Sequence, residues 1–395
     1  MREYKYHPED PRSRLDGYLG NLTESQQVAL ADLERAVQEN IMDLTMVCGR
    51  WGEEISRSTE PVQLCLLRFL RANDFIVPKA LSQLEENVIY RSEHDVGELV
   101  RSSMREILGC DPDKVNRYYP RWLLGHDRLG RPVLAKQYGG LKLSELTQLT
   151  TVEKMVNSHV WEQEMVLKLH REKTAETGII VDTSVVIIDT KGLTLRHVTK
   201  DFVLLLKSLA HLDQLIFPET LGKLFIVNTP ALFGYVWGIF SPLLDPRTRS
   251  KISILSRPKE WKPALLEIVD SNQLPPEYGG TGTPLDETPW LPVVLAPWGS
   301  TTTGGCISGS NQSPLSPSQE ESLLYETGSG GSSEEPGGEA VDCRGEYGGD
   351  EKLEDFEKEM ESTSSAAGSD ITGARVSGKG TEAKAESGGE GWLLS

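Results

Sequence analysis

An aspartate at a predicted strand end and two histidines on one predicted helix are the first candidates for chemistry in this chain. Asp189 ends the apolar run Val185–Asp189, and α/β enzymes keep catalytic groups at such strand ends. No base or nucleophile motif accompanies it, so we expect a turn or capping role. His159 and His170 lack the four-residue spacing of a helical metal pair. We expect both to be ordinary core or surface residues.

The chain lacks the short motifs that mark the common catalytic, nucleotide and metal sites. No GxSxG, Walker A, HExxH or CxxC pattern occurs in its 395 residues. Gly280-Thr-Gly282 begins like a dinucleotide fingerprint, but no predicted strand precedes it and no third glycine follows. The 5 cysteines are odd in number and far apart, which indicates a reducing compartment and no disulfide framework or zinc site. We expect no catalytic residues, no metal and no cofactor.

Charge and composition divide the chain into two parts. Its 41 basic and 59 acidic residues give a net charge of −18, which argues against a nucleic-acid partner because such proteins need a basic face. Residues 301–395 hold 19 acidic residues, 6 basic residues and 18 of the 37 glycines. So few apolar side chains cannot offset the entropy lost on ordering. We expect residues 298–395 to be a disordered acidic tail.

Hydrophobicity indicates a cytoplasmic protein. The first residues contain no apolar stretch of the kind a signal peptide needs. The longest apolar run, Ala231–Phe240, has about half the length of a membrane span. We therefore expect neither secretion nor a transmembrane helix.

Hydrophobic spacing predicts a helical region followed by a sheet covered by helices, which is an α/β fold. Thr23 followed by Gln26 is a capping-box pattern for the first helix. The predicted helices cover 24–47, segments opened by Pro61 and Pro78, 96–108, 152–173 and 198–215. The predicted strands cover 121–125, 132–137, 185–189, 224–228 and 252–255.

The segment 230–255 is unusually aromatic and contains two helix-weakening glycines. Gly234 and Gly238 each cost a helix about 1 kcal/mol relative to alanine. A short, weakened aromatic helix followed by basic residues can open toward a lipid surface, although a buried core helix has a similar composition. The aromatic residues are Phe233, Tyr235, Trp237 and Phe240, and the basic ones are Arg247, Arg249 and Lys251.

Six phrases, in order along the chain, resemble the CRAL-TRIO family of lipid-binding and lipid-transfer proteins. The likeness is closest to its phosphatidylinositol/phosphatidylcholine transfer proteins and runs from about Val62 to Gly282. The phrases lie in Leu66–Phe75, Tyr119–Val133, Val186–Gly192, Phe217–Asn228, Leu244–Ile252 and Leu274–Gly280.

The resemblance implies a helical N-terminal lobe packed on a sheet-floored pocket that holds one lipophilic molecule. With the helical pattern and the composition, it divides the chain into an N-terminal extension over 1–23, the lobe over 24–110, the lipid-binding domain over 111–297 and the tail over 298–395. It also implies that the aromatic helix is a gate that swings open at a membrane. The expected gate residues are Phe233, Gly234, Tyr235, Trp237, Gly238 and Phe240.

The resemblance also places candidate ligand residues. Glu219 and Lys251 match head-group positions of the family's inositol-lipid binders, with Thr248 and Asp127 also retained. A basic pair that usually follows the Leu-Arg-Ala phrase is replaced here by Asn73 and Asp74. Losing cations weakens the attraction for a phosphate. Phosphatidylinositol therefore fits less well than in the family's inositol-lipid binders.

The positions that match the family's choline-lipid site have become mostly apolar. Its usual hydroxyl-bearing residues align with Leu123, Leu134, Ser184 and Val186. A buried choline phosphate would lose most of its hydrogen-bond partners there. The pocket is thus expected to accept phosphatidylinositol or a less polar lipid, such as a sterol, a prenyl lipid, a tocopherol-like molecule or a neutral lipid.

Three classes of function follow. The leading one is a monomeric, non-enzymatic lipid carrier that contacts membranes transiently and presents its lipid to an enzyme such as a lipid kinase. The second is an interaction module whose pocket has degenerated. The third is an α/β enzyme, for which the sequence supplies no motif.

Overall fold

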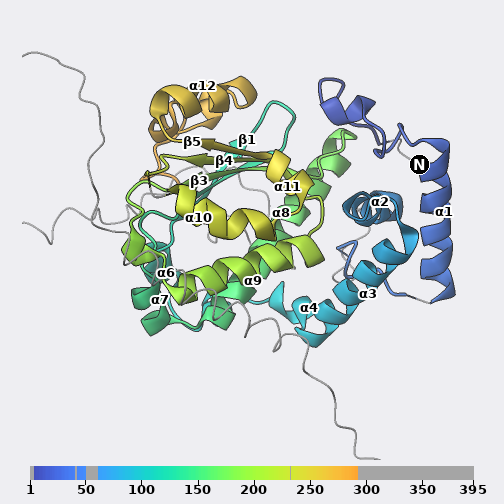
Figure 1. Ribbon diagram of the computed structural model, residues 1–395, viewed down its shortest axis with the longest axis horizontal. Coiled ribbons are helices and arrows are strands. Elements are labelled where there is room, and N and C mark those ends of the chain that lie inside the picture. The colour runs from blue at the N-terminus through green and yellow to red at the C-terminus, as the bar shows by residue number, and fades with distance from the viewer. Residues whose placement is uncertain (1–3, 41, 50–60, 232, 292–395) are drawn as a thin grey trace, which may run out of the picture. The chain divides into compact units, whose positions relative to one another are not determined.

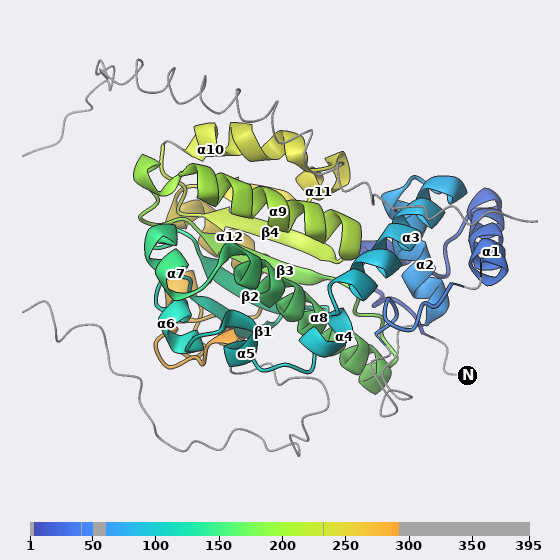
Figure 2. The ribbon, with the colours of Figure 1, turned by 90° about the horizontal axis from the view of Figure 1, so that it is seen from below.

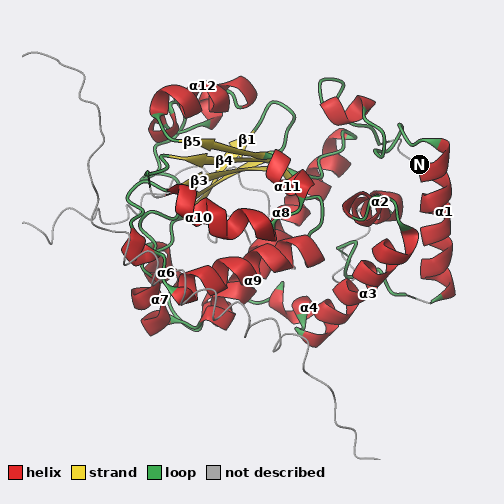
Figure 3. Ribbon diagram, in the orientation of Figure 1, coloured by secondary structure: helices red, strands yellow, loops and turns green. Residues whose placement is uncertain are grey.

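A computed structural model describes residues 4–40, 42–49, 61–231 and 233–291 of the chain (Figure 1). Over these ranges, helices come first, and a five-stranded sheet with further helices follows (Figure 3). This confirms the predicted α/β class with a helical N-terminal lobe. The predicted tail, residues 298–395, lies outside the described residues.

The first helix begins at the predicted cap. Thr23 and Gln26 form a capping box, in which each side chain accepts a hydrogen bond from the other residue's backbone N–H. The helix ends at Glu39, well before the predicted end at residue 47, and turns follow. The helices of this region are α1 (Glu24–Glu39), α2 (Val62–Ala72), α3 (Val77–Glu93), α4 (Val96–Leu99), α5 (Met104–Leu108) and α6 (Pro112–Asn116).

The segment predicted as one helix over 96–108 is two short helices, α4 and α5. Ser103 explains the break, because its side chain caps α5 and pairs with Glu106 in a second capping box. A serine that bonds the backbone in this way favours a helix start over a helix interior.

The sheet has the strand order β1-β2-β3-β4-β5. Its first pair is antiparallel, and β2 through β5 run parallel, as strands joined by helices must. The strands are β1 (Arg121–His126), β2 (Pro132–Gln137), β3 (Ser184–Asp189), β4 (Leu221–Val227) and β5 (Ile252–Leu255). The connecting helices are α7 (Leu143–Leu149), α8 (Val152–Thr177), α9 (Lys200–Ile216), α10 (Phe233–Phe240), α11 (Pro246–Ser250) and, after β5, α12 (Pro258–Ile268).

The two faces of the sheet are covered differently. Helix α12 lies on one face, and α8, α9 and α10 lie on the other (Figures 1 and 2). Because side chains alternate along a strand, neighbouring residues face opposite layers. The side packed against α12 is a continuous apolar core that includes Val133, Ala135, Val185, Ile187, Phe225, Val227, Trp261 and Leu265.

Buried polar contacts join the N-terminal helices to this unit. Asn87 on α3 donates to the backbone oxygen of Ile216 at 2.9 Å. Arg91 on α3 forms a 2.6 Å ion pair with Glu164 on α8, and both side chains are 1% exposed. Such a pair is costly to break because either charge alone would be left buried. The lobe is therefore held firmly against α8 and α9.

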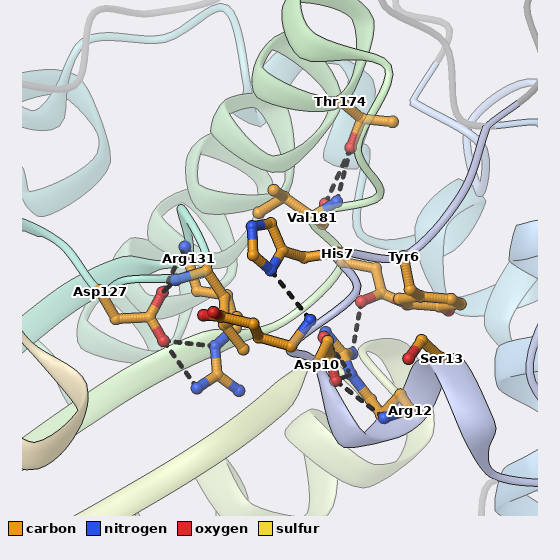
Figure 4. A network of polar contacts seen from close by, with 12 residues as sticks. Tyr6, His7, Asp10, Arg12, Ser13, Asp127, Arg131, Thr174 and Val181 are labelled. Atoms are coloured by element: carbon orange, nitrogen blue, oxygen red, sulfur yellow. Dashed lines mark hydrogen bonds and ion pairs between the residues drawn. The ribbon is translucent and has the colours of Figure 1, made fainter.

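The first described residues are also anchored. The Tyr6 hydroxyl donates to Asp182 at 2.9 Å, and the Arg12 guanidinium pairs with the same carboxylate at 2.6 Å. Asp10 holds Arg12 from the other side (Figure 4). The pKa of Asp182 is lowered to about 2, because its attraction to the arginines and its hydrogen bonds outweigh the effect of burial. This network fixes the N-terminal segment beside the start of β3.

Candidate functional site

A cavity of about 700 Å³ lies between the open face of the sheet and helices α8, α9 and α10. Most of the side chains that line it are apolar. Its floor consists of alternate strand residues, each pointing away from α12. These are Leu134 and Lys136 on β2, Ser184, Val186 and Ile188 on β3, Leu224 and Ile226 on β4, and Ile252 on β5.

Helix α10 covers part of the cavity with one face. Of the predicted gate residues, Phe233, Trp237 and Phe240 line the cavity, as does Val236, which the sequence analysis did not select. Gly234, Tyr235 and Gly238 do not line it. A side chain placed on either glycine would meet no atom within 4 Å. These glycines therefore weaken the helix rather than relieve a steric clash.

An ion pair lies at the cavity where β4 and β5 begin. Lys251 Nζ lies 3.1 Å from Glu219 Oε2, and both residues line the cavity together with Thr248. Glu219 adopts a φ of 60°, a left-handed conformation that is unfavourable for residues other than glycine. Asp245 accepts a hydrogen bond from the Thr248 N–H at 2.9 Å and so caps α11. We call Glu219, Thr248 and Lys251 the rim.

A chain of alternating charges continues from the rim to the N-terminal lobe. Arg247 lies 3.9 Å from Glu219 and forms a close ion pair with Asp74. Asp74 occupies one of the positions where the family's basic pair was expected. The rim therefore has an aspartate–arginine pair in that place.

Asp127 is not part of this arrangement, contrary to the prediction. Its carboxylate pairs with Arg131 at 2.6 Å (Figure 4). It also accepts hydrogen bonds from the backbone N–H groups of Leu129 and Arg131 at 3.0 and 2.8 Å. Asp127 is 2% exposed and does not line the cavity. Its role is to hold the turn between β1 and β2, where carboxylates commonly accept backbone hydrogen bonds.

The positions aligned with the choline site divide into two groups. Leu134, Ser184 and Val186 line the cavity. Leu123 does not, because it belongs to the edge strand β1. Ser184 Oγ lies 2.8 Å from His170 Nε2, and both side chains are buried. Burial is the main reason that the pKa of His170 is lowered to about 3.

A second set of polar residues in the cavity was not predicted. His159 on α8 lies 2.7 Å from Asp213 on α9, and Gln163 donates to the same oxygen at 2.8 Å. Lys136 on β2 lines the cavity beside them. His159 and His170 are both buried, as expected of core residues, and both also line the cavity. No sequence signal joins His159 to Asp213, because their pairing depends on how α8 packs on α9.

The structure also bears on Asp189, on metal binding and on membrane-spanning helices. Asp189 accepts the Lys191 backbone N–H at 2.9 Å and an Asn228 amide hydrogen bond at 2.9 Å, which confirms its turn role. Within the described ranges, no group of three or more His, Cys, Asp or Glu side chains could hold a metal ion. No helix in the same ranges is long and apolar enough to cross a membrane.

Comparisons with known proteins agree with this architecture. Two family models match: the CRAL/TRIO domain at residues 116–280 and the CRAL/TRIO N-terminal domain at residues 33–86. The chain resembles the SEC14 cytosolic factor of Candida glabrata, with 30% identity over 271 residues, which are 68% of this chain and 82% of that protein. It also resembles the phosphatidylinositol/phosphatidylcholine transfer protein SFH7 of Arabidopsis thaliana, with 32% identity over 59% of this chain and 42% of that protein.

A solved structure supports the fold. The crystal structure of Sfh5 matches with a TM-score of 0.53 at 19% identity, covering 67% of this chain and 91% of that one. The family models fall on the helical lobe and on the sheet that floors the cavity. With these matches and this cavity, the chain belongs to the CRAL/TRIO family.

Proposed function

We propose that the protein is a lipid carrier that holds one lipophilic molecule in the cavity and exchanges it at membranes. The observation that carries the proposal is the cavity itself, with about 700 Å³ of space and a largely apolar lining. Preformed apolar cavities with a few polar groups are typical ligand sites. The name of the Arabidopsis relative, a phosphatidylinositol/phosphatidylcholine transfer protein, supports the same class of ligand.

The proposed exchange requires contact with a membrane. Each CH₂ group removed from water contributes about 0.8 kcal/mol, so a chain of roughly 16 carbons contributes on the order of 12 kcal/mol. Release into water is therefore slow, and transfer needs a route into a bilayer. We propose α10 as that route, because it covers the cavity with Phe233, Trp237 and Phe240. A cytoplasmic location, transient membrane contact and a lipid kinase as a partner belong to the same proposal.

The rim and Ser184 are proposed as contacts for polar groups of the lipid that lie at their part of the cavity. Glu219, Thr248, Lys251 and Ser184 supply hydrogen-bond donors and acceptors in a cavity that is otherwise largely apolar. The apolar part would lie against Leu134 and Val186. Asp127 is not included, because its carboxylate is already occupied by Arg131 and two backbone N–H groups.

The proposed function is not catalytic. Ser184 and His170 have the geometry of a nucleophile and a base, with 2.8 Å between Oγ and Nε2. However, a pKa of about 3 makes His170 a weak proton acceptor at neutral pH. Its Nδ1 also lacks a hydrogen-bond partner among the described residues, so nothing there orients the ring as a catalytic base requires.

The direct test identifies the bound molecule. The full chain purified from its own host is measured by native mass spectrometry, and the bound material is then extracted and identified. We expect one lipid per chain. An empty protein that also takes up no lipid from vesicles would contradict the proposal and favour an interaction module.

A gate substitution tests the route. Phe233→Asp with Trp237→Asp places two charges on the cavity face of α10, and we expect lipid transfer between vesicles to fall at least tenfold while circular dichroism stays unchanged. Val28→Asp with Ile89→Asp adds the same charge at residues that are 56% and 53% exposed on α1 and α3. Normal transfer by the α10 variant would rule out this helix as the gate. Trp237→Asp alone repeats the test if the double variant does not fold.

A further inference from the structure

Four polar side chains from three elements meet in the cavity. They are Lys136 on β2, His159 and Gln163 on α8, and Asp213 on α9, and we call them the polar cluster. His159 Nε2 lies 2.7 Å from Asp213 Oδ1, and Gln163 Nε2 donates to the same oxygen at 2.8 Å. Both bonds use Oδ1, so within the described residues Asp213 Oδ2 is left as an acceptor.

The carboxylate of Asp213 is directed at the cavity. Its side chain is 42% exposed, whereas that of its partner His159 is only 8% exposed, and Asp213 is one of the lining residues. Burial raises its pKa, but the attraction to His159, the two hydrogen bonds and the nearby Lys136 lower the pKa below its usual value. An ionised acceptor in such a place forms stronger hydrogen bonds than it would in water.

Lys136 supplies donors beside this acceptor. Its Nζ lies 3.7 Å from Glu162 Oε2, which is longer than a hydrogen bond. Glu162 also forms a close ion pair with the buried Arg121. The ammonium group is thus close to Glu162 without a hydrogen bond to it, so its N–H groups can donate to a ligand in the cavity that Lys136 lines.

The charges around the cavity leave no surplus of cations. Among the described lining residues, the acidic ones are Asp213, Glu219 and Asp245, and the basic ones are Lys136 and Lys251. Arg247, which lies next to the rim, is paired with Asp74. A phosphate monoanion or dianion would bring further negative charge into this enclosed space, which is unfavourable without a matching cation.

We propose that the polar cluster anchors the hydroxyl group of an uncharged lipid, which donates to Asp213 Oδ2 and accepts from Lys136. A hydroxyl has one donor and two acceptor lone pairs, so it satisfies both groups and adds no charge. The inference rests on the proposed lipid-carrier function and narrows its ligand to hydroxyl lipids, among which sterols and diacylglycerols are the two sources to compare.

The test uses the full chain and mixed vesicles. Phosphatidylcholine vesicles containing equal amounts of cholesterol, cholestane, dioleoylglycerol and phosphatidylinositol are incubated with the protein, which is then repurified and its lipid identified. We expect at least ten times more cholesterol or dioleoylglycerol than phosphatidylinositol to be recovered with the protein. The amounts of cholesterol and dioleoylglycerol then show which of the two hydroxyl lipids the cavity prefers. Cholestane lacks the hydroxyl of cholesterol, so their ratio measures the anchor itself.

Asp213→Asn is the decisive variant. We expect the recovered ratio of cholesterol to cholestane, or the recovery of dioleoylglycerol, to fall about tenfold, because a hydrogen bond to a charged group is lost. Asp201→Asn removes a carboxylate from the same helix at an exposed position that does not line the cavity, and should change nothing. A purely structural role for Asp213 would lower the recovery of cholesterol and of cholestane equally and leave their ratio unchanged.

Each outcome separates the two proposals. Recovery of phosphatidylinositol or phosphatidylcholine as the main lipid, or an Asp213→Asn protein with an unchanged ratio, would overturn the hydroxyl anchor and leave lipid carriage intact. Recovery of no lipid from any arm would overturn both proposals.

Discussion

The two faces of the sheet are made from the same strands and similar residues, yet one is filled and the other is open. On β3, Val185 and Ile187 are 0% exposed and pack under α12. Their neighbours Val186 and Ile188 line the cavity. The two faces differ in the layer that covers them. On one face, Trp261 and Leu265 of α12 pack against the strands. On the other, α8, α9 and α10 leave a cavity of about 700 Å³ above the strands.

This difference separates residues that stabilise the fold from residues that are available to a ligand. A filled interior is close-packed, so every methyl group there contributes contacts. An open face forgoes those contacts and leaves apolar area that a lipid chain can cover. Truncation should therefore destabilise the protein much more on the filled face than on the open face.

The largest expected effect comes from truncating adjacent isoleucines. Ile187→Ala should lower the free energy of unfolding by about 2–5 kcal/mol, because it opens a void in a packed core. Ile188→Ala should lower it by less than about 1 kcal/mol, because the lost methyl groups already border the cavity. Denaturant unfolding of the lipid-free proteins measures both. Equal losses from the two substitutions would mean that the open face is packed in solution.

A second contrast concerns pH. The packed face carries the apolar core under α12, whereas the cavity face encloses His170, whose pKa is lowered mainly by burial to about 3 from 6.5. Between these two values the unfolded chain binds a proton that the folded chain does not, so the folded state loses stability as the pH falls below 6.5. From pH 8 to pH 5 this loss is about 2 kcal/mol.

His170→Gln tests that contribution. The variant should lose about 2 kcal/mol less stability than the natural chain between pH 8 and pH 5, measured by denaturant unfolding at each pH. Ser184→Ala removes the hydrogen-bonded hydroxyl but keeps the imidazole. The stability of this variant should therefore fall between pH 8 and pH 5 as steeply as that of the natural chain. If the stability of His170→Gln falls with pH as much as that of the natural chain, the His170 ring takes up its proton in the folded state, and this prediction is wrong.

The sequence predicts the elements well and the pairing between them poorly. Caps and runs of hydrophobic residues place the capping box at Thr23 and the strands β1, β2, β3 and β5 to within a residue or two. The aromatic cover of the cavity is also visible in the sequence, although the same pattern cannot reveal that Gly234 and Tyr235 lie off the cavity. Local patterns carry such information because they depend on neighbours along the chain.

The polar contacts that decide the ligand depend on tertiary packing. His159 and Asp213 are 54 positions apart, and Asp74 and Arg247 are 173 apart, so no spacing rule connects them. A lone histidine on a helix is indistinguishable in sequence from a core residue until the partner helix is placed. The prediction that Asp127 contacts the ligand failed for another reason. The resemblance identified an aspartate at the right position, but the carboxylate of Asp127 already accepts hydrogen bonds from the turn that contains it.

The smallest expected effect belongs to the ion pair of Asp74 and Arg247, which lies next to the rim. Asp74 is 76% exposed and paired with Arg247, and exposed pairs contribute about 0–1 kcal/mol. Asp74→Asn keeps a residue that tolerates the φ of 52° and leaves the contact of Arg247 with Glu219 in place. We expect stability to change by less than about 1 kcal/mol, while phosphatidylinositol uptake from vesicles rises by up to about fivefold at low salt.

The salt dependence and a matched control make this last prediction specific. Exposed charges are screened within about 3 Å at 1 M salt, so the gain in phosphatidylinositol uptake should disappear there. Asp32→Asn on α1 also removes one carboxylate from an exposed pair, with Arg35, and should leave uptake unchanged at either salt concentration. If Asp74→Asn and Asp32→Asn behave alike, total charge governs uptake. A difference confined to Asp74 would mean that this one pair limits the attraction of the rim for anionic lipids.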